Sequence, residues 1–426
     1  MQDFSRYFSG KTGVKLHYLK NKNGKKSKID FDLNLKQTRI QARSLGLLKP
    51  VGQTSSATLD VHLANGDLSS INHLKIKGRG ASLASGNIDF TTLKGEPLIK
   101  KGNLQNLHFG ENKLNVDLGG DKDLLKINIT GSFLDARPVL KGKKDEQRTQ
   151  TSNSTKRPFE IGINVIEMRT SDESTVTDAE IYTRNNHIGQ VERFEMNAKA
   201  GRGDLYVRYT PDDTGKLSLQ VESNNAGDTL RAFDLYSTIQ GGTLRIAGVP
   251  LEGGRFGDVR GQARIDNFRV SDAPVLVRLF NALSFKQGGK LNFKRLEAEF
   301  EWRIGSDGDL YLIKNGTTSG ASLGLTFDGY VDTAKDKMEF KGTAAPLEGI
   351  NNFIGKIPLI GDLLTGGGAL VAATYSIDGT TKDPKVSVNP LSVLTPGIIR
   401  KMLFENSKPE PENAAREYKK EPRGLN

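Results

Sequence analysis

Apolar and polar residues alternate along much of the chain. In residues 28–37, KIDFDLNLKQ, isoleucine, phenylalanine and leucine stand at every second position, with aspartate and asparagine between them. Alternation over four to eight residues predicts a β-strand with one apolar face and one solvated face. The positions that show this period include Ile29, Phe31, Leu33, Leu35, Leu74, Ile76, Ile88, Phe90, Leu114, Val116, Leu118, Leu125, Ile127, Ile129, Phe159, Ile161, Ile163, Val165, Leu205, Val207, Leu217, Leu219, Leu296, Phe300, Leu323, Leu325, Val386 and Val388.

Short turn sequences separate these predicted strands. They combine glycine with aspartate or asparagine, which is typical of hairpin turns. This spacing predicts an antiparallel meander. The turn sequences are ANGD at 64–67, LGGDKD at 118–123, PDDTGK at 211–216 and SDGD at 306–309.

Helix signals are few, and all of them lie after residue 225. Asp228 is the predicted N-cap of TLRAFDLYSTI, which ends at Gly241 and Gly242, and Asp272 is the predicted N-cap of residues 273–285. A third apolar stripe covers 347–354. Thr395 and Pro396 begin a fourth helix, in which isoleucine, methionine and leucine form one face and two basic residues another.

The first 225 residues therefore offer about ten predicted strands and no predicted helix to cover their apolar faces. An apolar sheet face has to be buried in some way. Three solutions remain open at this stage: packing on a second sheet, closure into a barrel, or curling into a gutter that holds apolar ligands.

Positive charge is concentrated at the start of the chain. The net charge is +11, and residues 1–50 contain twelve Lys or Arg against three Asp, a difference of +9. A basic face of this kind suits nucleic acid, anionic lipid or lipopolysaccharide, and a solvated segment around KNKNGKKSK is the alternative. We find no signal peptide or membrane-spanning segment, and because Met1 leads directly into a strand pattern we expect an N-terminal part to be missing.

Two polar segments are predicted to be irregular. Residues 141–157 contain no apolar residue and are predicted to form a flexible insertion, and the tail after about 405 is predicted to be disordered. The resulting division of the chain is 1–140, 141–157, 158–225, 226–404 and 405–426.

Catalytic signals are weak. Residues 320–324, GASLG, match the nucleophile elbow around Ser322, but the following residues continue a strand, whereas the elbow requires a helix there. The five histidines are scattered, the chain has no cysteine, and no nucleic-acid module is recognisable. We therefore predict a protein that is not an enzyme, with no metal, no cofactor and no nucleic-acid partner.

A series of segments in fixed order marks the C-terminal half of the chain. The segments are DTLRAFDLYSTIQGGTLRI (228–246), VRGQARIDNFRVSDAPVLVRLFNALS (259–284), SGASLGLTFDGYVD (319–332), GTAAPLEGINNFIGKIPLIGDLLTGGG (342–368) and ATYSIDGTTKDPKVSVNPLSVLTPGIIRKMLF (373–404). In order and spacing they resemble the AsmA-like region of the AsmA, TamB and YhdP group of Gram-negative envelope proteins, and they are most similar to the YhdP branch. A shorter match covers ITGSFLDARPVL at 129–140.

The resemblance implies a mainly β protein: an elongated, taco-shaped groove of antiparallel strands, with a few short helices in the C-terminal half. It also implies an inner-membrane anchor, a periplasmic location, and a role in conducting phospholipid toward the outer membrane, with membrane proteins as partners at the two ends. The chain departs from the family by lacking the anchor. A TamB-like scaffold for outer-membrane strands is the alternative, and a hydrolase on a β-solenoid is a third hypothesis.

Under the lipid hypothesis the apolar strand faces line the groove. The apolar segment IGKIPLIGDLLTGGG at 354–368 is then expected to plug its end, and the basic helix that follows is expected to contact a membrane or cap the sheet. The predicted lining residues are Ile29, Phe31, Leu33, Leu35, Leu114, Val116, Leu118, Leu125, Ile127, Ile129, Ile161 and Ile163, and the predicted plug or membrane-contact residues are Ile357, Pro358, Leu359, Ile360, Leu363, Leu364, Ile398, Ile399, Met402 and Leu403.

Overall fold

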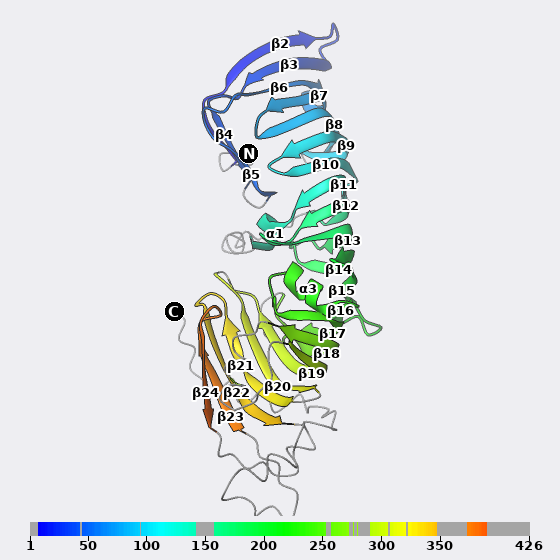
Figure 1. Cartoon of the computed structure of the whole chain (residues 1–426). Helices are drawn as coiled ribbons and strands as arrows, with labels where there is room; N and C mark the ends of the chain where they lie inside the picture. Colours follow the sequence, from blue (N-terminus) through cyan, green and yellow to red (C-terminus); the bar gives the residue numbers. More distant parts are fainter. Residues whose placement is uncertain are drawn as a thin grey trace, which may run out of the picture.

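One open sheet of 21 strands forms most of the molecule, which confirms the predicted β-groove. The strands follow one another along the length of the groove (Figure 1), and its outermost strands are β2 and β24. The computed structural model describes residues 7–42, 45–93, 95–141, 157–252, 257–271, 276, 279, 290–305, 307–320, 323–346 and 373–389.

The first part of the sheet is a meander, as predicted. The exception is the connection from β3 to β6, which contains two strands of a separate three-stranded sheet, β1–β4–β5. The strands are β1 (Phe8–Gly10), β2 (Gly13–Lys20), β3 (Lys26–Asn34), β4 (Thr38–Ala42), β5 (Leu47–Lys49), β6 (Ser55–Ala64), β7 (Asp67–Gly78), β8 (Ala81–Leu93), β9 (Glu96–Phe109), β10 (Asn112–Gly120) and β11 (Leu125–Asp135).

The second part continues the same sheet to β24. Each strand pairs antiparallel with the strand that follows it in sequence. The strands are β12 (Phe159–Arg169), β13 (Thr175–Asn185), β14 (Val191–Ala200), β15 (Gly203–Pro211), β16 (Leu217–Ser223), β17 (Ile239–Pro250), β18 (Val259–Ser271), β19 (Lys290–Arg303), β20 (Leu310–Gly320), β21 (Leu323–Asp332), β22 (Lys337–Pro346), β23 (Ala373–Gly379) and β24 (Pro384–Asn389).

One pair of neighbours departs from the predicted antiparallel meander. Strands β11 and β12 are parallel, so between them the chain has to return to the margin of the sheet at which β11 began. A parallel pair cannot be joined by a tight hairpin, and the polar segment 141–157 lies within this connection. The connection begins with the short helix α1 (Arg137–Lys141), where no helix was predicted.

The second described helix also differs from the prediction. Helix α3 (Ala226–Ala232) has Asn225 as its N-cap, because the Asn225 side chain accepts the N–H of Asp228. Asp228 lies in the first turn, where a negative charge suits the helix dipole. Gly241 and Gly242 do not end this helix: they lie inside β17 with φ values of 64° and 83°.

Bulges recur along the sheet and bend it. At several of them a polar residue takes a positive φ, which asparagine and aspartate adopt more readily than other non-glycine residues. The Asn106 N–H donates to Asn115 Oδ1 at 2.8 Å, and the Asn315 N–H donates to Asp328 Oδ1 at 2.8 Å. A side chain of the neighbouring strand thus accepts the backbone N–H that the bulge removes from the ladder of backbone hydrogen bonds. The bulged residues with positive φ include His73, Asn106, Asp178 and Asn315.

The two long margins of the sheet differ. On one margin, which we call the turn rim, short connections such as 21–25, 65–66 and 212–216 join the strands. On the opposite margin, the insertion rim, the chain forms β4, β5, α1 and α3 (Figure 1). The β4–β5 connection reaches α1, since a Cβ on Gly46 would lie 2.8 Å from Pro138 Cγ.

Candidate functional site

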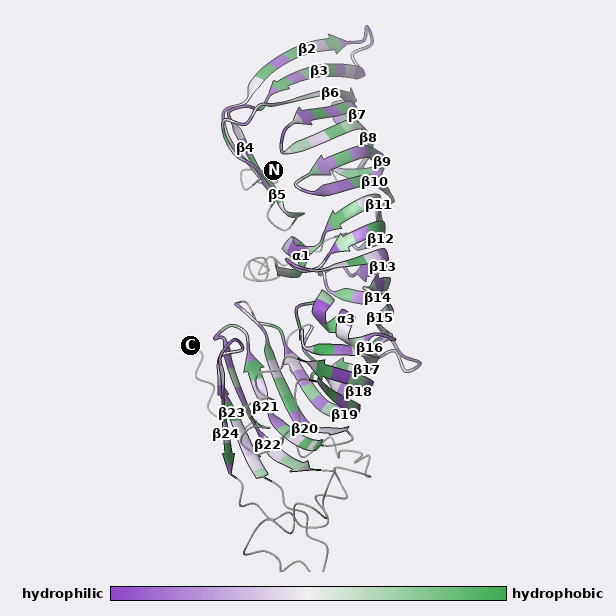
Figure 2. Cartoon of the chain, viewed as in Figure 1, coloured by the Kyte–Doolittle hydropathy of each residue, from purple (hydrophilic) through white to green (hydrophobic). Residues whose placement is uncertain are grey.

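A continuous row of residues crosses one face of the sheet, with one residue from each of the 21 strands. We call the face that carries this row the inner face. Each member is the cross-strand partner of the next, and none is charged. Hydrophobic and hydrophilic residues follow one another along the strands, as green and purple bands in Figure 2. The row is Tyr18, Ile29, Val61, Ile71, Ile88, Gly102, Leu118, Ile127, Ile161, Thr183, Phe194, Tyr209, Leu219, Gly248, Gly261, Phe300, Ile313, Gly329, Phe340, Ile377 and Val386.

The structure places the predicted lining residues around this row. Four of them, Ile29, Leu118, Ile127 and Ile161, belong to it, and the others except Leu35 lie on the same face of β3 and β10–β12. Leu35 follows the end of β3, and only 8% of its surface is exposed. The predicted plug and membrane-contact residues, between 357 and 403, lie outside the described residues.

The outer face carries charged side chains, whereas the row on the inner face carries none. Lys28 Nζ lies 2.6 Å from Asp30 Oδ1 and 3.2 Å from Asp60 Oδ2, and His73 Nδ1 lies 2.8 Å from the same Asp60 oxygen. Burial alone would raise the pKa of Asp60, but the hydrogen bonds from His73 and Lys28 outweigh it and hold the pKa below its usual range. The sheet is therefore amphipathic across its thickness.

Coverage of the inner face changes along the groove. At β2 the inner-face side chains of Val14, Leu16 and Tyr18 are 51%, 61% and 50% exposed. From β3 to β8 the row residues are half-buried, Gly102 of β9 is buried, and no described helix packs on this stretch. This stretch is the accessible apolar surface.

Toward the C-terminus the chain covers its own inner face. Ala232 and Phe233 of the α3 region pack in a cluster with residues of β10–β16, and Ala226 packs in the next cluster with Leu244. Leu279, which is 1% exposed, belongs to the last cluster together with Ile377. In the described part, α3 and Leu279 therefore cover the inner face toward the C-terminus, whereas the plug predicted at 354–368 lies outside the described residues.

One cation lies on the inner face at the turn rim. Nη1 of Arg157 donates to the carbonyl of Ile99 (3.0 Å), and Nη2 donates to that of Leu124 (2.9 Å). Gly120 pairs with Leu125 and faces the same way, and a Cβ on it would collide with Arg157 Nη2. Burial lowers the pKa of Arg157, and its Nε is buried without a hydrogen-bond partner among the described residues. We did not predict Arg157, because no local pattern distinguishes it within a basic segment.

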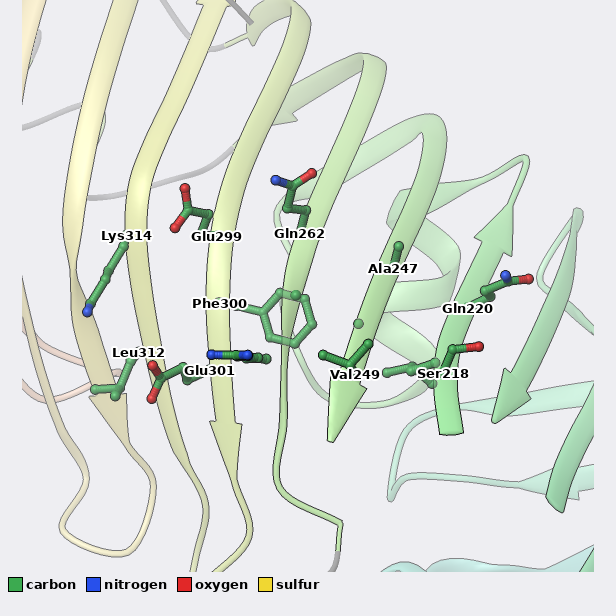
Figure 3. A pocket seen from close by; sticks show the side chains of 14 residues that line it. Ser218, Gln220, Ala247, Val249, Gln262, Glu299, Phe300, Glu301, Leu312 and Lys314 are labelled. Atoms are coloured by element: carbon green, nitrogen blue, oxygen red, sulfur yellow. The ribbon is translucent and has the colours of Figure 1, made fainter. Parts of the chain in front are cut away.

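The outer face holds a depression of about 530 Å³ across β16–β20 (Figure 3). Its lining residues include Gln220, Gln262, Glu299, Leu312 and Lys314. Side chains of both charge signs share this surface, so its chemistry favours no single class of ligand.

No group of three or more His, Cys, Asp or Glu side chains is placed to hold a metal ion within the described residues. Ser322 lies outside the described residues, and the strand that was expected after it is β21, which begins at Leu323. No helix in the described part is long and apolar enough to span a membrane.

Comparison with models of protein families, with curated proteins and with solved structures finds no match to this chain.

Proposed function

We propose that the chain is a non-enzymatic lipid-binding groove that conducts phospholipid along its inner face. The observation that carries this proposal is the uncharged row that runs through all 21 strands. Neighbouring strands are about 4.8 Å apart, so the row extends for roughly 95 Å. The part of the row that the chain leaves uncovered, toward β2, suits acyl chains that move from strand to strand while headgroups remain in water.

The energetics favour loose binding. Burial of a methylene group contributes about 0.8 kcal/mol, so ten half-buried methylenes on each of two chains contribute about 8 kcal/mol against water. That figure corresponds to a dissociation constant of about 1 μM before ordering costs. A bilayer buries the same methylenes more completely, so lipid passes readily from the groove into a membrane, as conduction requires.

In this proposal the protein works in the bacterial envelope, in the periplasm, and meets the inner and outer membranes or their proteins. The resemblance of residues 226–404 to the AsmA-like region supports this setting. The basic first fifty residues also suit an anionic lipid surface.

The test is mass spectrometry of the purified chain after mild extraction, together with transfer of a labelled phospholipid between vesicles. Phospholipid should be recovered with the protein, and transfer should rise with protein concentration. A folded, β-rich preparation that contains no phospholipid and does not accelerate transfer would refute the proposal.

The exposed edge at β2 supports a second candidate function. Its inner-face side chains are at least half exposed, and in the described residues β2 has no partner on its other side. Such an edge can pair with a client strand, as a scaffold for outer-membrane proteins would require. In that case a β-strand peptide should protect the β2 amides from hydrogen exchange, and charges introduced on the inner face should leave client binding unchanged.

A further inference from the structure

Arg157 is the feature of the groove that the apolar row does not explain. Its guanidinium group lies on the inner face, over Gly120 at the end of β10, where the neighbouring positions are apolar. A guanidinium carries five N–H donors, and the bonds to Ile99 and Leu124 use one on each Nη. Both acceptors are neutral carbonyls, so these bonds do not balance the charge.

The surroundings of Arg157 suit an anionic group at the rim of the groove. Leu118, Leu125 and Ile127 lie on the inner face beside it, within reach of the acyl chains of a lipid whose headgroup is at the turn rim. Burial lowers the pKa of Arg157, and the charges of Asp121 and Asp123 in the adjacent turn oppose that effect. Neither carboxylate hydrogen-bonds to the guanidinium among the described residues, and Asp121 Oδ1 instead accepts the N–H groups of Asp123 and Leu124. Guanidinium binds phosphate through paired hydrogen bonds, more specifically than an ammonium does.

We propose that Arg157 binds the phosphate of a phospholipid whose acyl chains lie on the inner face at β9–β11. This inference rests on the proposed lipid function and adds a headgroup site to it. The site would make the groove select phosphate-bearing lipids over neutral ones of the same acyl composition. It would also place the headgroup at the turn rim, where no described helix or strand blocks access to water.

The test compares two lipids with identical acyl chains, a phosphatidylethanolamine and a diacylglycerol, each titrated from the same detergent micelle. The natural protein should bind the phospholipid roughly ten- to a hundredfold more tightly, as expected for charge-assisted hydrogen bonds. Arg157→Gln should abolish that preference, and Arg157→Lys should retain part of it. The matched control is Arg184→Gln, because Arg184 is 48% exposed and pairs with Glu160 and Glu192 on the outer face.

The preference, a ratio of two affinities, is the informative readout because partial loss of folded protein lowers both affinities equally. An unchanged preference in Arg157→Gln would assign Arg157 a purely structural role. Equal binding of the two lipids by the natural protein would also overturn the site while leaving the proposed function intact, whereas no binding of either would refute both. Inorganic phosphate at 10 mM should not displace the phospholipid, and displacement would identify a free-phosphate site instead.

Discussion

A single negative charge on the inner face provides a sharp test of the groove. Ile127 lies in the row on β11, between Leu118 of β10 and Ile161 of β12. In the substitution Ile127→Glu, the carboxylate would stand in the path of any acyl chain that moves along the row. We expect Ile127→Glu to fold and to block lipid movement.

The expected magnitudes follow from the position of Ile127. Full burial of an isoleucine contributes about 1.5–3 kcal/mol, so loss of this half-buried side chain should reduce stability by about 1 kcal/mol. An acyl chain can cover the new carboxyl only if it is protonated. With an ordinary glutamate pKa of about 4.3, protonation at pH 7 costs about 3.7 kcal/mol, a factor of roughly 500 in occupancy of this position.

The assay is phospholipid transfer between vesicles, measured from pH 7 to pH 5. Transfer by Ile127→Glu should be nearly lost at pH 7 and should recover as the pH falls, because protonation at pH 5 costs only about 1 kcal/mol. The control is Thr130→Glu, which puts the same charge on the exposed outer face of the same strand. Equal transfer by Ile127→Glu and Thr130→Glu at pH 7 would show that lipid does not pass over this face.

Three further predictions concern stability and coverage. Asn106→Val should lower the free energy of unfolding by about 1–2 kcal/mol, because a β-branched residue at φ 54° is strained, and Asn106→Gly should nearly restore it in denaturant titrations. Hydrogen bonds from Arg137 lower the pKa of Asp135, so this ion pair stabilises the fold above about pH 4. Asp135→Asn should therefore have a lower free energy of unfolding than the natural protein at neutral pH, and this difference should vanish as the pH falls through the lowered pKa. A difference in free energy of unfolding that is the same at acid and neutral pH would contradict the prediction. A photo-crosslinking residue in place of Ile88 should capture lipid. The same residue in place of Ile377 should not, because the chain itself covers Ile377. Strong lipid labelling at both positions would place lipid along the entire groove.

Local patterns predicted the strands well, because strand alternation depends on near neighbours only. The run from Ile29 to Leu33 became β3, and the turns ANGD and PDDTGK join strands as expected. The same patterns do not show which strands pair in parallel. That arrangement depends on a connection whose path is not encoded in the period of the strands, so the parallel β11–β12 pair was missed.

The candidate site shows the same division between local and non-local information. Residues such as Ile127 were predicted on the apolar face because successive side chains of a strand point to opposite faces of the sheet, so every second residue lies on the same face. The continuity of the row could not be predicted from the alternation alone. Bulges at residues such as Asn106 shift the pairing register, so that apolar residues of neighbouring strands remain on the same face of the sheet. Arg157 was missed because its role depends on Gly120, which is distant in sequence but lies beneath the guanidinium.

The uneven coverage of the inner face limits the route that lipid can take. The described elements that pack on that face, such as α3 and Leu279, belong to connections on the insertion rim, and they cover the face toward β24. Lipid that enters over the accessible strands β3–β9 therefore meets a covered face before it reaches the last strand. The described turn rim carries only short connections, so it offers the shorter path out of the groove. We accordingly expect lipid to leave sideways across the turn rim, near the strands where Arg157 lies, rather than past β24.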